Sequence, residues 1–151
     1  MARSSCALSA PCGPRVIVAD VNLIACLLLG GSHLSLAQRV LERDATWAAP
    51  LLWRSEFRNV LAAFIRQRGL SVSDAWRAHG LADQLLAAEE FIMPGERVLA
   101  LVAVSACSAY DCEYIALAEE LAVALVTADH QLLHAFPERA ISPMNFVAGK
   151  S

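Results

Sequence analysis

Lysine is almost absent from this chain of 151 residues: Lys150 is its single lysine, and the other basic residues are all arginines. Twelve basic residues against fifteen acidic ones give a net charge of −3, so no overall positive field marks a nucleic-acid binder. No stretch reaches the roughly 20 apolar residues that cross a bilayer. The longest run without charges or strong helix breakers is residues 98–110. The sequence predicts no membrane span, and any contact with nucleic acid must be local.

Disulfide and zinc-binding spacings are also missing. The five cysteines are Cys6, Cys12, Cys26, Cys107 and Cys112. Their number is odd, no CxxC pair occurs, and several lie in apolar runs, as reduced buried thiols do. We therefore expect a cytoplasmic protein. Residues 1–14 lack the apolar run of about 7 to 15 residues that an export signal needs, so we expect a flexible leader there.

Internal repeats, linkers and low-complexity tracts are absent after the leader, which favours one domain at residues 15–147 with a short tail at 148–151. The 28 alanines and 22 leucines predict a high helical content. Short apolar runs alternate with longer helical patterns. This alternation predicts an α/β fold, a three-layer α/β/α domain with a mostly parallel sheet of about five strands.

The predicted elements follow from apolar periodicity and from capping residues. Strands are expected at residues 15–20, 45–49, 89–93 and 123–127, with a weak edge strand from residue 141. Helices are expected at residues 21–29, 32–44, 50–69, 74–88, 96–106, 108–122 and 131–135. Ser32 is expected to cap the second helix, Pro50 to open the third, and Ser71 or Ser73 to cap the fourth.

Four carboxylates are expected at one edge of this sheet, where ligands bind in parallel α/β folds. Asp20 ends the first strand, Asp129 follows the strand at 123–127, Asp111 lies at the start of a helix, and Glu56 lies one turn into another. Taken singly, capping explains each aspartate better, including a Ser108-x-x-Asp111 capping box, and a surface position explains Glu56. Taken together, four acids at the same edge indicate a site.

Mutual repulsion indicates what such a site would bind. Ionised carboxylates about 5 Å apart repel by roughly 3 kcal/mol per pair at an effective dielectric constant near 20. Protons or a divalent cation must offset this repulsion. Oxygen donors without His or Cys suit Mg²⁺ or Mn²⁺, which also bind phosphate oxygens. The four acids therefore predict a magnesium or manganese site that accepts an anionic substrate.

Rival motifs are incomplete. The HQLLH segment at 130–134 has zinc-ligand spacing, but Gln131 cannot act as a general base and no third ligand is evident. His33 and His79 have no partner pattern and are expected at the surface. A phospho-receiver needs a lysine late in the sheet, and a haloacid-dehalogenase-type phosphatase needs Asp where Asn22 stands. The nucleotide-binding motifs GxGxxG and GxxxxGK[ST] do not occur.

The order and spacing of the acidic segments resemble the PIN-domain ribonucleases, most closely the VapC-type toxins of bacterial toxin–antitoxin pairs. The resemblance covers nearly the whole chain after residue 14. It is carried by residues 18–22 (VADVN), 50–56 (PLLWRSE), 110–119 (YDCEYIALAE) and 125–129 (LVTAD). The most diagnostic part is the interval from Asp111 to Asp129, with Tyr-Asp-x-x-Tyr at its start and Val-Thr-x-Asp at its end.

This resemblance implies a metal-dependent endoribonuclease that hydrolyses RNA phosphodiester bonds. The implied catalytic residues are Asp20, Glu56, Asp111 and Asp129. The three aspartates would hold Mg²⁺ or Mn²⁺, and Glu56 would be a second-site ligand or orient water. Asn22 and Thr127 would orient waters or carboxylates, with simple capping as the alternative. The implied partners are RNA, a cognate antitoxin and a second copy of the chain in a homodimer.

The helix that carries Glu56 also provides candidates for RNA contact. Arg54 and Arg58 lie one turn apart on it, and arginines there can bind phosphates. Its apolar side chains are expected in the core, with a dimer or antitoxin groove as the alternative. Glu113 stands where relatives more often carry a small or apolar residue. It could add a fifth carboxylate or face solvent, and we expect it to face solvent. A housekeeping RNA-processing PIN nuclease and a non-catalytic PIN module that binds RNA or protein remain the alternative functions.

Overall fold

A fully parallel sheet forms the centre of the molecule. The computed structural model describes residues 15–150; the predicted leader at residues 1–14 and the last residue of the predicted tail lie outside the described residues. The strands are β1 (Val16–Ala19), β2 (Thr46–Pro50), β3 (Glu90–Phe91), β4 (Leu125–Val126) and β5 (Ala140–Ile141). They pair in the order β3-β2-β1-β4-β5, and every pair is parallel. The predicted α/β fold with about five strands is confirmed.

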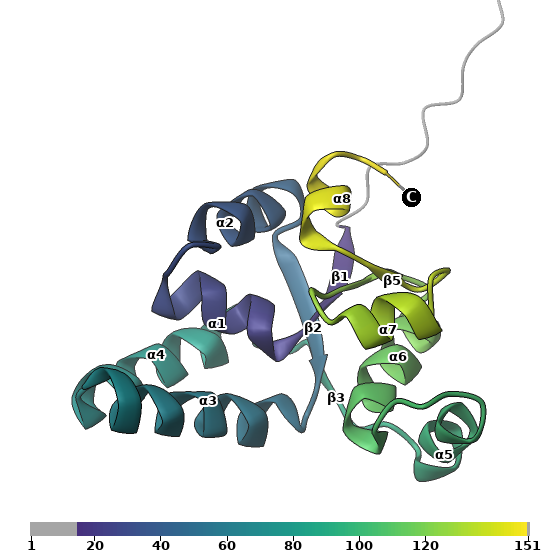
Figure 1. The fold of residues 1–151 in the computed structure, drawn as a ribbon, viewed down its shortest axis with the longest axis horizontal. Coiled ribbons are helices and arrows are strands. Elements are labelled where there is room, and N and C mark those ends of the chain that lie inside the picture. Colours follow the sequence, from purple (N-terminus) through teal and green to yellow (C-terminus); the bar gives the residue numbers. More distant parts are fainter. Residues whose placement is uncertain (1–14, 151) are drawn as a thin grey trace, which may run out of the picture.

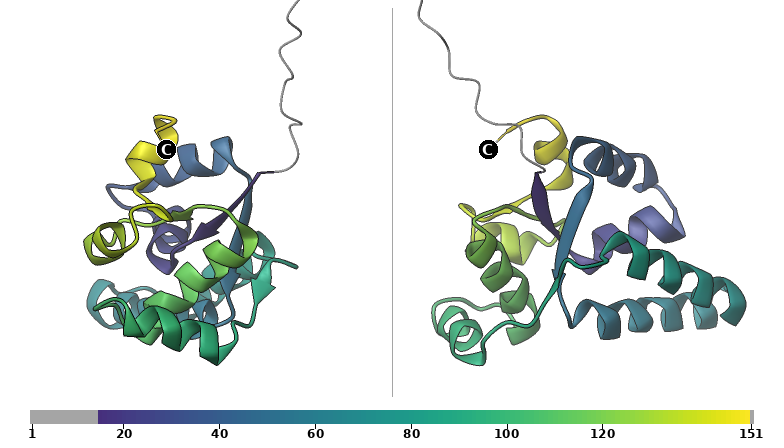
Figure 2. Two further views of the ribbon diagram at one scale, coloured as in Figure 1. Left: turned by 90° about the vertical axis from the view of Figure 1, so that its right-hand side faces the viewer. Right: turned by 180° about the vertical axis from the view of Figure 1, so that it is seen from behind.

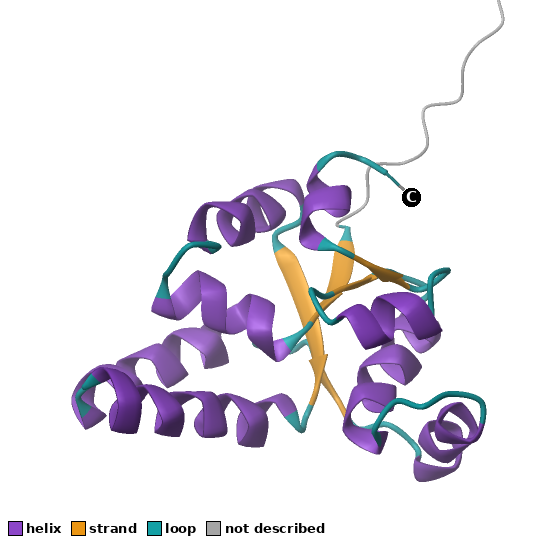
Figure 3. Cartoon of the chain, viewed as in Figure 1, coloured by secondary structure: helices purple, strands orange, loops and turns teal. Residues whose placement is uncertain are grey.

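Helices flank both sides of this sheet. Those formed by residues 15–150 are α1 (Val21–Leu29), α2 (Leu34–Arg43), α3 (Trp53–Arg68), α4 (Val72–Leu85), α5 (Gly95–Ala103), α6 (Ala109–Leu121), α7 (His130–Ala135) and α8 (Pro143–Val147). Helices α1 to α4 lie on one side of the strands and α5 and α6 on the other (Figure 1). Figure 3 shows the strands enclosed between these two helical layers. No single helix of the described residues is long and apolar enough to cross a membrane.

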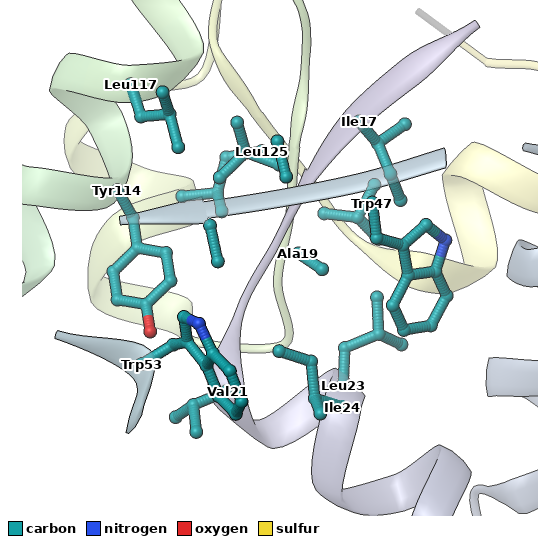
Figure 4. Close-up of a cluster of buried hydrophobic side chains, with 14 of the residues drawn as sticks. Ile17, Ala19, Val21, Leu23, Ile24, Trp47, Trp53, Tyr114, Leu117 and Leu125 are labelled. Carbon is teal, nitrogen blue, oxygen red and sulfur yellow. The ribbon is translucent and has the colours of Figure 1, made fainter. Parts of the chain in front are cut away.

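The core is densest around β1, because this strand is covered on both faces. Ile17 and Ala19 are buried, and Tyr114 and Leu117 from α6 are equally enclosed. Figure 4 shows these side chains together with Ile24 of α1, on the opposite side of the strand. The strand is thus held between α6 and α1, and its carboxyl end opens directly into the first turn of α1.

Two predicted helix starts are wrong. Ser32 does not cap α2, which begins after His33 without a side-chain capping bond. Pro50 does not open α3, because it is the last residue of β2 and pairs with Phe91 of β3. Because proline has no backbone N–H group, it is tolerated at the end of a strand as well as at the start of a helix. Helix α8 was not predicted, although Ser142 caps it and Pro143 is its first residue, as helix starts favour.

Two polar residues are buried, and one of them, His79, was expected at the surface. Asp44 is 5% exposed, because it closes α2 directly before the buried strand β2. His79 is 6% exposed, and its ring stacks against both Trp53 and Trp76 with centroids 5.8 Å apart in each pair. Its Nδ1 lies 3.2 Å from Oδ2 of Asp83. The packing of α4 against α3 buries this ring, which no local pattern announces.

The direction of the strands brings several helix starts to one place. β1 begins near α8, and its other end leads into α1 (Figures 1 and 2). Because the strands are parallel, β2 and β4 end at this same edge, where α3 and α7 follow them. The loops at this edge carry the predicted acids.

Candidate acidic site

Asp20 occupies the turn from β1 into α1 and is only 8% exposed. It caps α1, with its Oδ1 accepting the backbone N–H of Asn22 at 3.4 Å. Its Oδ2 accepts the hydroxyl of Thr127 at 2.6 Å. Thr127 lies just after β4, so this bond joins the ends of two neighbouring strands.

Asp129 is also both a helix cap and a member of this group. Its Oδ1 accepts the backbone N–H groups of Gln131 and Leu132 at 2.8 and 3.2 Å, which caps α7. Its own N–H donates to the hydroxyl oxygen of Thr127 at 3.0 Å. Within residues 15–150, Oδ2 of Asp129 accepts no hydrogen bond. Capping therefore uses one carboxylate oxygen and leaves the other available for a ligand.

Asp111 and Glu56 approach from two further helices. Asp111 lies in the first turn of α6, and its N–H donates to Oγ of the capping residue Ser108 at 3.1 Å. Glu56 lies in the first turn of α3 and is half-buried. Its Oε1 accepts the hydroxyl of Tyr114 at 2.8 Å. Tyr114 belongs to the Tyr-Asp-x-x-Tyr segment, but the sequence predicts no role for it in the site. Its place three residues after Asp111 puts both on one face of α6.

The pKa values show that these acids interact. Burial raises the pKa of Asp20, and the charges of Asp129 and Asp111 raise it further, while the hydrogen bonds that Asp20 accepts lower it. Burial also raises the pKa of Glu56, with additional contributions from Asp20, Asp111 and Glu113. No basic side chain among the described residues contributes to either shift. The structure thus brings the four predicted acids into one electrostatic cluster without a compensating cation.

Glu113 corrects one expectation. It was expected to face solvent, but it is half-buried and burial raises its pKa. Its charge contributes to the raised pKa values of both Glu56 and Tyr114. Glu113 follows Asp111 by two residues on α6, close enough for its charge to act on Glu56. It is therefore a fifth carboxylate at the edge of the cluster.

The donor chemistry of the cluster suits a metal ion, but residues 15–150 form no finished coordination shell. The donors that converge are carboxylate and hydroxyl oxygens, the type that Mg²⁺ and Mn²⁺ prefer. Their uncompensated charge also favours a divalent cation. However, no three His, Cys, Asp or Glu side chains of residues 15–150 are already arranged to hold a metal ion. The zinc alternative gains no support. His130 and His134 are exposed on α7, and they form no such group of ligands with another His, Cys, Asp or Glu of residues 15–150.

The two residues assigned to orientation differ in what they do. Thr127 is fully buried, and its hydroxyl connects Asp20 with the backbone of Asp129. Asn22 contributes its backbone N–H to Asp20, while its side chain is exposed. The geometry gives Thr127 the positioning role, while the exposed side chain of Asn22 makes no hydrogen bond to the acids among residues 15–150.

The two arginines predicted to contact RNA, Arg54 and Arg58, differ in their hydrogen-bond partners. The guanidinium of Arg54 donates to both carboxylate oxygens of Glu90 at 2.7 and 2.6 Å and to Asp83 at 2.5 Å. It also lies 5.1 Å from the ring centroid of Trp53. A phosphate contact by Arg54 would require these bonds to break. Arg58 is exposed and donates only to Ser55 among the described residues, so it is the one retained as a phosphate-binding candidate.

Comparisons with known proteins give structural likeness only. A scan against protein-family models finds no match, and a search of curated proteins finds none. The crystal structure of PAE2754 from Pyrobaculum aerophilum is similar, with a TM-score of 0.70 and 19% identity over 88% of this chain and 87% of that chain. A toxin–antitoxin complex from Klebsiella pneumoniae contains a chain with a TM-score of 0.63 and 18% identity, covering 84% of this chain and 97% of that one. These likenesses establish the fold.

Proposed function

We propose that this protein is a metal-dependent endoribonuclease of the PIN type and the toxin of a toxin–antitoxin pair. The observation that carries the nuclease proposal is the cluster of Asp20, Glu56, Asp111 and Asp129. The charges of Asp111 and Asp129 raise the pKa of Asp20, those of Asp20 and Asp111 raise the pKa of Glu56, and no basic side chain of residues 15–150 lowers either pKa. An anionic RNA phosphate can approach such a cluster only when a cation is present. The acids and the phosphate would then share the same ion.

Asp20, Asp111 and Asp129 would hold this ion, Mg²⁺ or Mn²⁺. When bound, it would supply activation of a water for attack on the phosphodiester and stabilisation of the leaving oxygen. The chain's own contribution begins with Thr127, which fixes the carboxylate of Asp20 through its hydroxyl. A carboxylate fixed in this way loses little entropy when a ligand binds.

Glu56 would act as the base that accepts the proton of the attacking water. Its pKa is raised above that of an ordinary glutamate, chiefly by burial, so it is a stronger base at neutral pH than an exposed carboxylate. Tyr114 occupies Oε1, and this leaves Oε2 to orient a water and accept its proton. The result is one carboxylate with a base role beside three with ligand roles.

The toxin part of the proposal rests on fold and on motif resemblance. A chain of the Klebsiella pneumoniae toxin–antitoxin complex shares this fold over most of both chains. With the acidic segments described above, this supports a toxin role and silencing by a cognate antitoxin. We further propose that the toxin is cytoplasmic and forms a homodimer.

RNA cleavage tests the nuclease proposal directly. The purified protein is expected to cut RNA with Mg²⁺ or Mn²⁺ and to stop on addition of EDTA. Asp111→Asn is expected to abolish cleavage while the protein stays folded. Glu42→Gln removes the same charge from an exposed position on α2 and is expected to cut normally. Normal cleavage by Asp111→Asn would remove this residue from the mechanism.

Induced expression tests the toxin proposal. Growth arrest is expected when the chain is expressed alone, and growth should return when the adjacent open reading frame is co-expressed. The Asp111→Asn variant should not arrest growth. Mapping of RNA ends in arrested cells would then identify the cleaved RNA, whereas RNA cleavage in vitro without arrest would favour a housekeeping nuclease.

A further inference from the structure

A cavity of about 260 Å³ lies beside the acidic cluster, among α1, α2, α7 and the start of α8. Its walls are mostly apolar. The lining residues include Asn22, His33, His130 and Met144. It has the size of a small organic group, because sites for drug-sized ligands usually enclose about 300–1,000 Å³.

This cavity and the acidic cluster share their two loops. Asn22 follows the capping residue Asp20 by two positions and lies on the cavity wall. Ala128, which also lines the cavity, stands between Thr127 and Asp129. A polymer whose phosphate lies at the acids would therefore have its neighbouring group at the mouth of this cavity.

The wall chemistry fits a nucleobase. Two imidazole rings, those of His33 and His130, border an otherwise apolar space, and both residues are exposed at its rim. Proteins bind unpaired RNA bases by stacking them on rings of this kind and by hydrogen bonds to the base edge. The side-chain amide of Asn22 offers both a donor and an acceptor for such an edge.

We infer that this cavity binds one base of single-stranded RNA, next to the phosphate that lies at the acidic cluster. The inference rests on the proposed function for its substrate class. An apolar protein segment fits less well. It would cover Asn22, His33 and His130 and displace the water bound to their polar groups without offering hydrogen bonds in its place. The base stays in the cavity while the neighbouring phosphate lies at the acidic cluster, so the cavity selects which bond is cut.

Binding of RNA that lacks single bases tests this inference. Short single-stranded RNA is compared with versions in which one nucleotide at a time has no base, using fluorescence anisotropy with Ca²⁺ and cleavage with Mn²⁺. At one position next to the cut, loss of the base is expected to weaken binding about tenfold, within the range for stacking of one base. Absence of any such position, or absence of RNA binding, would overturn the inference.

Variants identify the cavity as the origin of the effect. The double substitution His33→Ala with His130→Ala is expected to bind intact and base-free RNA equally. His134→Ala, an exposed histidine of α7 outside the cavity wall, is the matched control and should keep the full effect. Met144→Trp is a second cavity variant, in which a larger side chain at an exposed position narrows the cavity. It replaces the double variant in the test if the double variant is not properly folded, as judged by the loss of cooperative unfolding. A full base effect in both cavity variants would overturn the inference.

Failures of the two proposals are distinguishable. Cleavage by the native chain without any base effect would retain the nuclease and reject the base cavity. If removal of a base weakens RNA binding by the native chain but not by the cavity variants, and the native chain does not cleave RNA, the base cavity is retained and the nuclease proposal is rejected. If RNA binding is unchanged but the double variant loses its complex with the product of the adjacent reading frame, the cavity serves a protein contact and the inference is wrong.

Discussion

At the scale of single residues, Thr127 is the centre of the acidic cluster although it carries no charge. It is fully buried, donates its hydroxyl to Asp20 and accepts the backbone N–H of Asp129. A hydroxyl has one proton to donate, so the bond to Asp20 fixes its direction. Removal of this group would leave a buried carboxylate short of a partner, which is costly.

Thr127→Val should therefore lower stability by about 2 kcal/mol, as loss of a buried hydrogen bond to a charged group does. It should also raise the pKa of Asp20 further, because the hydrogen bond from Thr127 lowers it. Urea unfolding measures the stability change. Thr46→Val is the control, since this half-buried β2 residue makes no side-chain hydrogen bond within residues 15–150. Equal losses in both variants would contradict the role of Thr127.

Arg54 and Arg58 should differ in what their loss changes. Arg54→Ala should cost about 1 kcal/mol of stability, a modest amount because its side chain is 33% exposed. Its effect on the salt dependence of RNA affinity should be small. Arg58→Ala should reduce the slope of log affinity against log salt by about one, as loss of one phosphate contact does. A reduced slope for Arg54→Ala instead would show that its ion pairs with Glu90 and Asp83 open on RNA binding.

At the scale of elements, three helix N-termini meet at the acids. Helices α1, α6 and α7 begin at Asp20, Ser108 and Asp129, each with a side-chain capping bond. The N-terminal end of a helix carries partial positive charge, which favours carboxylates placed there. Capping and a ligand role therefore do not exclude each other at this site, because a carboxylate can cap a helix with one oxygen and keep the other free, as Asp129 does.

Ser108→Ala tests whether the first turn of α6 positions Asp111. Loss of the cap should lower the free energy of unfolding by about 1 kcal/mol. It should also reduce RNA cleavage, because the first turn of α6, which the cap holds in place, carries the proposed metal ligand Asp111. Ser71→Ala removes the same kind of cap from α4, where Ser71 accepts the N–H of Asp74 at 3.0 Å. It should destabilise the protein equally and leave cleavage unchanged. If both variants cut equally well, the cap does not position Asp111.

Local patterns predicted the elements better than the contacts between them. The α6 to β4 segment was predictable because its cap at Ser108 and its apolar run at 123–127 are both local signals. Pro50 was assigned to a helix because proline suits both a helix start and a strand end, and only pairing with β3 decides between them. The partners of Arg54 lie 29 and 36 residues away, so no spacing rule could indicate them.

At the scale of the whole molecule, the fold assembles acids that repel one another. Asp20 and Glu56 lie 36 residues apart in sequence, at the starts of α1 and α3, and Asp111 and Asp129 lie at the starts of α6 and α7. The raised pKa values of Asp20 and Glu56 mean that folding favours their protonated forms. Their contribution to stability is complete below the unfolded pKa values, 3.8 and 4.5, and is lost as pH rises through the higher folded values.

Asp111→Asn should accordingly stabilise the metal-free protein at neutral pH by on the order of 1 kcal/mol, because one repulsive charge is gone. The gain should shrink as pH falls and the remaining acids take up protons. Urea unfolding in EDTA across this pH range measures it, with Glu42→Gln as the control that should gain nothing. A gain independent of pH would contradict a repulsive origin.

Calorimetric titration of the native chain with Mn²⁺ at neutral pH tests the central claim most directly, because it asks whether the gathered acids bind a divalent cation at all. The native protein and Glu42→Gln should bind Mn²⁺ saturably, while Asp111→Asn and Asp20→Asn should bind it at least about tenfold more weakly. Equal binding by all four proteins, or none by the native chain, would contradict the account.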